Sequence, residues 1–343
     1  HKSEKSRKNR LLNHITKSIG SKFNAVDVIQ FGSSANGFGM KNGDFDICLI
    51  IPDANQRQLI KKMKNILRSQ GMEDVHAILN AKVPILKFKD PRSGLKVDLS
   101  INNSLANYNT KLLNAYSNLS ELIRNYVICI KYWALHRNIS EPRNGTFSSY
   151  AWTLLALNHL IEEKVIPNLQ DTENKTLVEI DGAEFDVSFD EPKDFKISED
   201  VTISSLVSGF FMKYATWDWK NKVVSIRNGG SVQRDEKSWM DEEPSALDLL
   251  NLEKIDSKLG PHHLAVEDPF EHDHDLSSVL SVIGELSVRN EIIRAAKMFG
   301  ENKNWAEICE TVMPERFQDM EPEDLFHDLR SKSTKDVENL KSK

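Results

Sequence analysis

Two aspartates spaced one residue apart, Asp44 and Asp46, begin a run of apolar residues that ends at Ile51. In an extended strand side chains alternate between faces, so the two carboxylates share one face while Phe45 and Ile47 line the other. Like charges this close repel each other unless a cation lies between them, and Mg²⁺ prefers carboxylate and phosphate oxygens. The pair therefore predicts a divalent-metal site on one face of a strand.

A glycine and a serine stand upstream of this strand, directly after a shorter apolar run over residues 26–31. Gly32 allows the backbone to approach a ligand closely, and Ser33 is expected to open a helix whose free N–H groups favour phosphate. A D-x-D pair alone is most often a solvent-exposed hairpin. Its coupling to the Gly-Ser pair is what favours catalysis.

A third carboxylate, Asp98, falls on the polar face of the strand expected over residues 95–101. Lys96 and Ser100 share that face because side chains alternate along a strand. The strand returns after a turn at residues 90–94, so it can bring Asp98 beside Asp44 and Asp46. A lone aspartate on a strand is usually only solvated, and its assignment as a third metal ligand rests partly on a family resemblance.

These motifs resemble those of the nucleotidyltransferase superfamily typified by DNA polymerase β. More narrowly, the chain is similar to the terminal uridylyltransferases and the related template-independent poly(A) polymerases. Six motifs match in order: Gly32-Ser33, Asp44-Phe45-Asp46, Asp98 with Asn102-Asn103, Lys131-Tyr132-Trp133-Ala134, Gly145-Thr146-Phe147-Ser148-Ser149-Tyr150, and Glu267-Asp268-Pro269-Phe270. Each motif is weak alone, whereas six in order over residues 31–299 are specific.

The resemblance implies a role for each matched residue. Asp44 and Asp46 would bind two Mg²⁺ or Mn²⁺ ions, and Asp98 would bind one ion and help deprotonate the RNA 3′-hydroxyl. The implied nucleotide-binding residues are Gly32, Ser33, Asn109, Thr110, Lys131, Ser149, Tyr150, Asp268, Glu271 and His274. Among them Ser33, Lys131 and Ser149 would contact phosphates. Tyr150 would stack on the base, and Asn109 and Thr110 would bind the ribose and uracil edge.

Several of these residues also have ordinary structural interpretations. The asparagine-rich stretch around Asn109 is typical of a turn, and Tyr150 is equally typical of a core tyrosine. Lysines usually lie on a solvated helix face, although Lys131, inside an apolar helix, needs an anionic partner. Leu135 stands where family members often carry a second triphosphate lysine, so the chain departs from the family pattern there.

The nucleotide choice depends on a histidine. His274 corresponds to the residue that uridylyltransferases place against the uracil edge and that ATP-selecting members generally lack, so the resemblance favours UTP. His272 is the alternative specificity residue. The histidines at 262, 263, 272 and 274 lie among carboxylates, which leaves a zinc site as a further alternative. The alternative functions are an ATP-using poly(A) polymerase and a catalytically inactive RNA-binding scaffold.

The chain is long enough for two domains and has the composition of an ordinary globular protein: 343 residues, of which 39% are hydrophobic and 28% charged. The expected class is α+β. A nucleotidyltransferase palm, a mixed sheet with flanking helices, would occupy residues 18–103. A mainly helical domain would comprise residues 1–17 and 104–343, including a poly(A)-polymerase-associated region at about 201–275. The active site would lie in the cleft between them.

Hydrophobic periodicity predicts the main elements of both domains. Helices are expected over residues 13–19, 119–135, 148–164, 201–214 and 277–299, with another capped by Pro52-Asp53 and ended by Gly71. Strands are expected over 75–79, 83–88 and 95–101, and a short extended piece over 222–226. Residues 167–200 are expected to form an acidic, loop-rich insertion, and the polar tail from residue 321 a solvated helix.

Charge and cysteine content indicate the partners and the compartment. The net charge of −6 argues against indiscriminate nucleic-acid binding, whereas residues 1–22 carry seven Lys or Arg against one Glu and are suited to RNA contact. Three widely spaced cysteines without C-x-x-C favour a reducing compartment, and we expect the cytoplasm. No apolar stretch suits a bilayer. The expected partners are UTP, a single-stranded RNA 3′ end and proteins that target the enzyme, and the protein is expected to be a monomer. Because the first residue is not Met, we expect a fragment of a longer protein.

Overall fold

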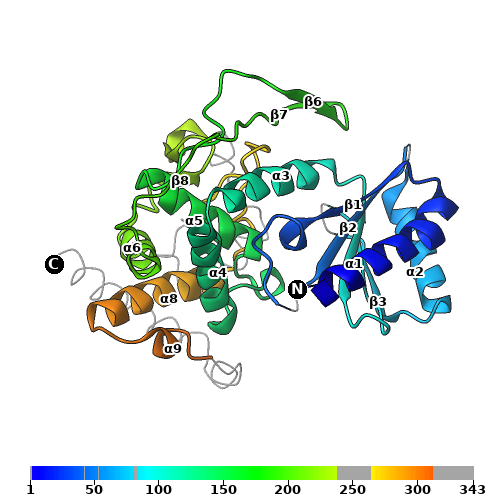
Figure 1. Cartoon of the computed structure of the whole chain (residues 1–343), viewed down its shortest axis with the longest axis horizontal. Coiled ribbons are helices and arrows are strands. Elements are labelled where there is room, and N and C mark those ends of the chain that lie inside the picture. Colours follow the sequence, from blue (N-terminus) through cyan, green and yellow to red (C-terminus); the bar gives the residue numbers. More distant parts are fainter. Residues whose placement is uncertain (1, 42, 53, 81–82, 238–263, 312–343) are drawn as a thin grey trace, which may run out of the picture. The chain divides into compact units, whose positions relative to one another are not determined.

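A computed structural model describes residues 2–41, 43–52, 54–80, 83–237 and 264–311 (Figure 1). The chain divides into two compact units. The first, called the palm unit below, comprises His1–Leu119 and Leu177–Val187. The second, called the helical unit, comprises Ser120–Thr176 and Ser188–Lys343. The tail from residue 321, Asp53, and the histidines at 262 and 263 lie outside the described residues.

The palm unit is built on a five-stranded mixed sheet in the order β1-β2-β5-β4-β3. The strands are β1 (Asp27–Phe31), β2 (Phe45–Ile50), β3 (Glu73–Ile78), β4 (Ile85–Lys89) and β5 (Lys96–Ile101). The β2–β5 pair is parallel, and the other neighbours run antiparallel. Because β2 and β5 are adjacent and parallel, equivalent positions on the two strands lie side by side.

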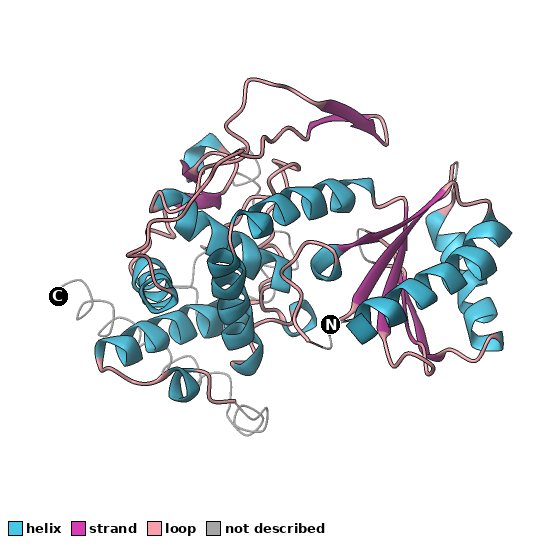
Figure 2. Ribbon diagram, viewed as in Figure 1, coloured by secondary structure: helices cyan, strands magenta, loops and turns pink. Residues whose placement is uncertain are grey.

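One face of this sheet is packed by helices α1 (Lys2–Ile15) and α2 (Gln56–Ser69), which Figure 2 shows beside the magenta strands. A single buried cluster joins Leu11 and Ile15 of α1 and Met63 of α2 to Ile47 and Leu99 of the sheet. The alternation of apolar and polar residues along β2 and β5 therefore directs one face into this core. The charged side chains are left on the other face.

Two further elements complete the palm unit. Helix α3 (Ser104–Leu119) follows β5, and the short hairpin of β6 (Leu177–Ile180) and β7 (Ala183–Asp186) is contributed by the acidic insertion. The compact units thus differ from the predicted domain boundaries at α1, at α3 and at the β6–β7 hairpin. The reason is hydrophobic packing, since α1 contributes core residues to the sheet and α3 contacts β1 and the turn that follows it.

The helical unit contains helices α4 (Glu121–His136), α5 (Ser149–Glu162), α6 (Ile203–Ala215), α8 (Val282–Gly300) and α9 (Trp305–Ile308). Helix α5 is the central one, because its residues from Ala151 to Ile161 are all buried. A hairpin of β8 (Lys222–Ser225) and β9 (Gly230–Gln233) packs against α5. Val224 of β8 also bridges to Val266 in the E-D-P-F segment.

Most predicted elements are present with shifted ends, but the N-terminal region differs. The helix expected over residues 13–19 is α1 from Lys2 to Ile15, continued by a π-helical segment, Thr16–Gly20. Leu11, Ile15 and Ile19 are all buried, and the wider π turn keeps Ile19 on the packed side. Helix α2 begins after Asn55, whose side chain accepts from the amide of Gln58.

Two further properties of the described residues concern their helices and their cysteines. None of their helices combines the length and apolar character that crossing a membrane requires. Cys48, Cys129 and Cys309 are all free thiols.

Candidate active site

The turn after β1 is shaped by a glycine that no other residue can replace without strain. Gly32 has φ +68, and a Cβ at this position would lie 2.2 Å from Oδ2 of Asp46. Its amide donates to Oγ1 of Thr110 at 2.9 Å, and that hydroxyl donates to the carbonyl of Ala106. The Gly32 turn is therefore held between the β2 carboxylate and helix α3.

The helix expected at Ser33 is a single 3₁₀ turn, Gly32–Ser34. The amides of Ala35 and Asn36 both donate to the Gly32 carbonyl, so the turn closes on itself. A Cβ at Gly39 would lie 2.8 Å from the Ser33 carbonyl oxygen, so the later glycine of the N-G-F-G sequence packs directly on this turn. Tight backbone contacts, and not a regular helix, position Ser33.

The strand registers place four chemically active side chains in one row across the sheet. Asp46 lies opposite Asp98 in the parallel pair, Asp98 lies opposite Lys87 of β4, and Lys87 lies opposite His76 of β3. Directly opposed residues point to the same face of a sheet. The register therefore brings Asp98 next to Asp46, on the face opposite the helices.

The ammonium group of Lys87 connects the third aspartate to the first. It forms a close ion pair with Oδ2 of Asp98 and lies 3.8 Å from Oδ2 of Asp44. From the sequence, Lys87 was predicted only as part of a strand. The available signal was alternation, because Leu86 and Phe88 point into the core and leave Lys87 on the face of the hairpin partner Asp98.

The carboxylates of this face suit a divalent ion. Their oxygens are the hard ligands that Mg²⁺ and Mn²⁺ prefer, and the Lys87 ammonium already provides a positive charge beside Asp44 and Asp98. Within the part of the chain that the structure describes, no group of three or more His, Cys, Asp or Glu side chains is close enough to hold a metal by itself. A bound ion would therefore complete its ligand shell with nucleotide phosphate and water.

Thr110 and Asn109 lie on helix α3, where the asparagine-rich sequence had been compatible with a turn. Thr110 is buried, and its hydroxyl is used by the Gly32 amide and the Ala106 carbonyl. Thr110 therefore supports the Gly32 turn. Asn109 is one residue earlier on the same helix.

In the helical unit, Lys131 and Ser149 lie on two packed helices. Lys131 is 2% exposed on α4, so it is not the solvated helix lysine of the simplest interpretation. Ser149 is the first residue of α5, and the helix is capped by Ser148, whose side chain accepts from the Ala151 amide. Free amides at such a helix start favour anions.

Tyr150 and the E-D-P-F segment meet within the helical unit. The Tyr150 hydroxyl donates to Oδ2 of Asp268 at 3.0 Å, and Oδ1 of Asp268 accepts from the amides of Phe270 and Glu271. Burial raises the pKa of the Asp268 carboxyl, although these hydrogen bonds oppose the shift. Burial also raises the pKa of Tyr150, and the Asp268 charge adds to that effect.

His274 closes the loop that begins at Asp268. The Asp268 amide donates to the His274 carbonyl, and the His274 amide donates to the Glu271 carbonyl. Nδ1 of His274 lies 3.2 Å from Oε2 of Glu271. His274 is half-buried, whereas His272, the alternative specificity residue, is exposed.

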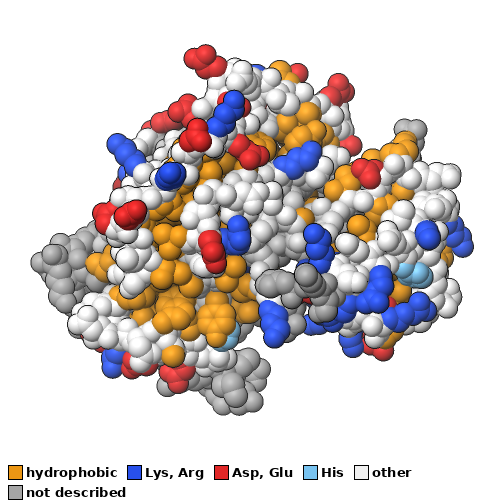
Figure 3. Space-filling view, viewed as in Figure 1, with side chains coloured by type: hydrophobic (Ala, Val, Ile, Leu, Met, Phe, Trp, Pro, Cys, Tyr) orange, Lys and Arg blue, Asp and Glu red, His pale blue; other side chains and the backbone are white. Residues whose placement is uncertain are grey.

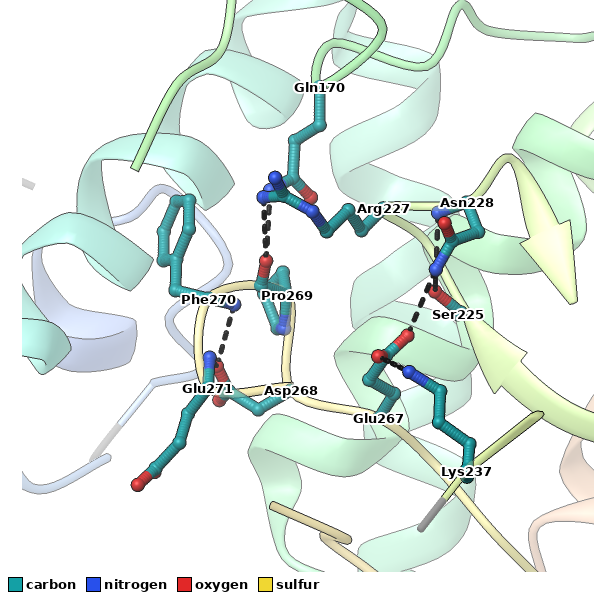
Figure 4. Close-up of polar contacts among 10 residues, drawn as sticks. All are labelled: Gln170, Ser225, Arg227, Asn228, Lys237, Glu267, Asp268, Pro269, Phe270 and Glu271. Atoms are coloured by element: carbon teal, nitrogen blue, oxygen red, sulfur yellow. Dashed lines mark hydrogen bonds and ion pairs between the residues drawn. The ribbon is translucent and has the colours of Figure 1, made fainter. Parts of the chain in front are cut away.

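Four residues outside the predicted set hold the E-D-P-F segment, and Figure 4 shows them around Glu267 and Pro269. Gln170 and Arg227 both donate to the Pro269 carbonyl, at 3.1 and 3.4 Å. Glu267 is buried and accepts from Asn228 and Lys237. Gln170, Arg227, Asn228 and Lys237 carry no periodic sequence signal, since they come from loops and turns and are brought together only by folding.

Two family models match the chain. Residues 1–118 match the central palm domain of the mitochondrial-like poly(A) RNA polymerases. Residues 202–274 match the model described as Cid1 family poly A polymerase.

Curated relatives include enzymes named for either nucleotide. Terminal uridylyltransferase cid1 of Schizosaccharomyces pombe is 31% identical over 288 residues, which is 80% of this chain and 69% of the relative. Terminal uridylyltransferase 7 of Homo sapiens is 30% identical over 82% of this chain but only 19% of its own length. Poly(A) RNA polymerase GLD2 of Mus musculus is 31% identical over 61% of this chain and 46% of its length.

Solved structures show the same fold over most of the chain. A cytoplasmic RNA terminal U-transferase gives a TM-score of 0.74 at 28% identity, covering 91% of this chain and 93% of that one. A Cid1 poly(U) polymerase structure with Mg and 3′-dATP also gives 0.74 at 28% identity, with 91% and 94% covered. The chain thus has an α+β palm and a helical poly(A)-polymerase-associated domain, and it belongs to the Cid1 family of template-independent RNA 3′-end nucleotidyltransferases.

Proposed function

We propose that this chain transfers UMP from UTP to the 3′ end of single-stranded RNA without a template. The observation that carries the choice of UTP is His274, which is half-buried and held at Glu271 in the loop that Asp268 and Tyr150 anchor. An imidazole at a fixed position can hydrogen-bond the uracil edge, and its bulk disfavours a purine. Relatives named uridylyltransferases give further support.

The aspartates of the palm unit hold the two Mg²⁺ or Mn²⁺ ions in this proposal. Asp44 and Asp46 bind both ions, Asp98 binds one, and Asp98 helps to accept the proton of the RNA 3′-hydroxyl. When bound, the ions align the hydroxyl with the α-phosphate and stabilise the charge of the departing pyrophosphate. Solved relatives with Mg-nucleotides support this choice of metal.

The remaining predicted residues bind the nucleotide. The Gly32-Ser33 turn and Ser149 at the start of α5 contact phosphates, and the Lys131 ammonium neutralises the triphosphate charge. The ring of Tyr150 stacks on the base, and Asp268 and Glu271 orient Tyr150 and His274. Asn109 contacts the ribose or the uracil edge. Thr110 acts through the Gly32 turn that it supports.

RNA contact is expected to use the basic N-terminal segment. Arg7 donates to the Ser93 carbonyl and Lys8 pairs with Glu4, so both help to hold α1, whereas Lys5, Arg10, Lys17 and Lys22 are exposed. Figure 3 shows Lys and Arg gathered on the visible face of the palm unit. We propose a monomer acting in the cytoplasm, with targeting proteins selecting its RNAs.

The test is extension of a short labelled RNA with each NTP in turn, with Mg²⁺ or Mn²⁺. We expect tailing with UTP above ATP, and a loss of about 10²–10³-fold or more in Asp98→Asn, because a metal ligand at the transferring phosphate is removed. Preference for ATP would establish the poly(A) polymerase alternative. No tailing with any NTP, even at high Mn²⁺, would support the alternative of an inactive RNA-binding scaffold.

A further inference from the structure

Lys87 is the polar residue of β4 that faces the proposed metal ligands. It lies between the apolar positions Leu86 and Phe88, so strand alternation turns it toward Asp98. Its ammonium pairs with Asp98 and reaches to within 3.8 Å of Asp44. The positive charge of Lys87 is therefore shared between the carboxylate of Asp98 on β5 and that of Asp44, directly before β2.

The next lysine on the same face of β4, Lys89, forms an ordinary surface ion pair and serves as a comparison. Lys89 lies two residues further along β4 and pairs at 3.0 Å with Glu73, its directly opposed partner on β3. That pair is exposed, with 39% and 50% of the two side chains accessible, against 30% and 19% for Lys87 and Asp98. Exposed cross-strand pairs contribute little. The Lys87 pair is better shielded, and it involves two proposed ligands.

We infer that Lys87 is the counter-ion of the metal site in the metal-free protein. It is a positioning residue that keeps Asp44 and Asp98 in place until a divalent ion binds them. Two carboxylates held on one sheet face repel unless a cation lies between them. The ammonium supplies that cation in the metal-free protein. A divalent ion binding the same oxygens must displace the ammonium or share them with it, so Lys87 lowers metal affinity while stabilising the metal-free fold.

The inference rests on the proposed metal role of Asp44 and Asp98, but it does not depend on which nucleotide is used. It predicts an effect of unusual sign, because removing a lysine next to the ligands should improve metal binding. A lysine needed only for packing would leave metal binding unchanged or weaken it when removed.

The experiment measures Mn²⁺ binding to the whole chain by electron paramagnetic resonance, without nucleotide or RNA. Lys87→Met and Lys87→Gln should bind Mn²⁺ about tenfold more tightly than the unchanged protein, since the lysine charge beside Asp44 and Asp98 no longer opposes a divalent ion. Lys87→Arg should keep the original affinity. Lys89→Met is the matched control on the same strand face, and it should leave Mn²⁺ affinity within about twofold.

A second readout is thermal unfolding with and without metal. Without metal, Lys87→Met should unfold about 2–4 °C lower than the unchanged protein, and saturating Mn²⁺ should remove the difference. Unchanged or weaker Mn²⁺ binding in both Lys87→Met and Lys87→Gln would overturn the inference. Failure of both variants to fold in saturating Mn²⁺ would also overturn it, because Lys87 would then be required with the metal present.

The proposed metal site itself is tested separately by Asp98→Asn. This substitution should weaken Mn²⁺ binding both in the unchanged chain and when it is combined with Lys87→Met. Mn²⁺ binding that is insensitive to Asp98→Asn would contradict the metal role of Asp98. That result is distinct from unchanged affinity in Lys87→Met, which would contradict only the role of Lys87.

Discussion

The Tyr150 hydroxyl donates a 3.0 Å hydrogen bond to the buried carboxylate of Asp268. The other oxygen of Asp268 accepts from two backbone amides of its own loop, so the carboxylate fixes that loop and the tyrosine together. Tyr150 is partly buried at the start of α5. An aromatic ring held in one position is suited to stacking on a base.

Substitutions of Tyr150 should distinguish the contribution of its ring to UTP binding from that of its hydroxyl group. Tyr150→Ala should raise the KM for UTP by roughly 5–150-fold, the equivalent of about 1–3 kcal/mol of stacking. Tyr150→Phe keeps the ring and should raise KM only a few-fold. Tyr132→Phe, at an exposed tyrosine of α4, is the control and should have no effect. Equal effects of Phe and Ala at position 150 would contradict a stacking role.

Gly32→Ala should abolish most activity while leaving the fold intact. The new Cβ would lie 2.2 Å from Oδ2 of Asp46, so that carboxylate must move by more than an ångström. A displacement of this size in a catalytic ligand typically costs about 10²-fold in rate. The measurement is kcat for tailing, with far-UV circular dichroism to verify folding.

A matched control separates the contact with Asp46 from backbone strain. Gly94 also has a positive φ, +71, but a Cβ there would meet nothing within 4 Å. Gly94→Ala should therefore destabilise the chain by about 1 kcal/mol through strain and retain activity. If Gly94→Ala lost as much activity as Gly32→Ala, strain alone would explain the loss.

Leu135→Lys should improve UTP binding if the chain lacks the family's second triphosphate lysine. Leu135 is 54% exposed on α4, one turn after Lys131, so a lysine there can be introduced without a buried charge. We expect the KM for UTP to fall by roughly two- to tenfold. Ile283→Lys, which adds the same charge at an exposed residue of α8, should leave KM unchanged. A gain in both variants would indicate only nonspecific attraction.

His159 should make stability depend on pH. It is buried in α5 with Nδ1 hydrogen-bonded to the Tyr126 hydroxyl, and burial lowers the pKa of His159 from 6.5 to about 3. Between these values the unfolded chain binds more protons than the folded one, so the free energy of unfolding falls as pH drops below 6.5. The slope from this residue is at most about 1.4 kcal/mol per pH unit.

The measurement for His159 is urea unfolding at pH 7, 6 and 5. His159→Asn, which keeps a polar atom near the Nδ1 position, should unfold with a weaker pH dependence than the unchanged chain. His76→Asn, at an exposed histidine of β3, should retain the full dependence. Equal slopes for all three proteins would show that His159 does not titrate on unfolding.

Local patterns predicted the parts of the site that lie on strands. Alternation along β2 and β5 placed Asp46 and Asp98 on one face, and a single turn between β4 and β5 sufficed to bring that strand back. The partner of Asp98 was not predictable in the same way. Lys87 becomes its neighbour only through the β4–β5 register, which depends on how the whole sheet packs on α1 and α2.

Other differences arise where tertiary packing outweighs local propensity. The asparagine-rich stretch after β5 resembles a turn, yet residues such as Leu112, Leu113 and Tyr116 bury one side of helix α3. Gln170 and Arg227 support the E-D-P-F loop because both donate to the carbonyl group of Pro269. Such contacts between distant loops leave no periodic pattern in the sequence.

In the proposed function the preference for UTP depends on His274, and competition between UTP and ATP in one reaction measures that preference most directly. We expect the unchanged chain to incorporate UMP over AMP. His274→Ala should lower this ratio by about tenfold, the value of a lost hydrogen bond in a partly buried site, while His272→Ala should not. A chain that incorporates AMP preferentially, or a ratio that His274→Ala leaves unchanged, would contradict the proposed selection of UTP by His274.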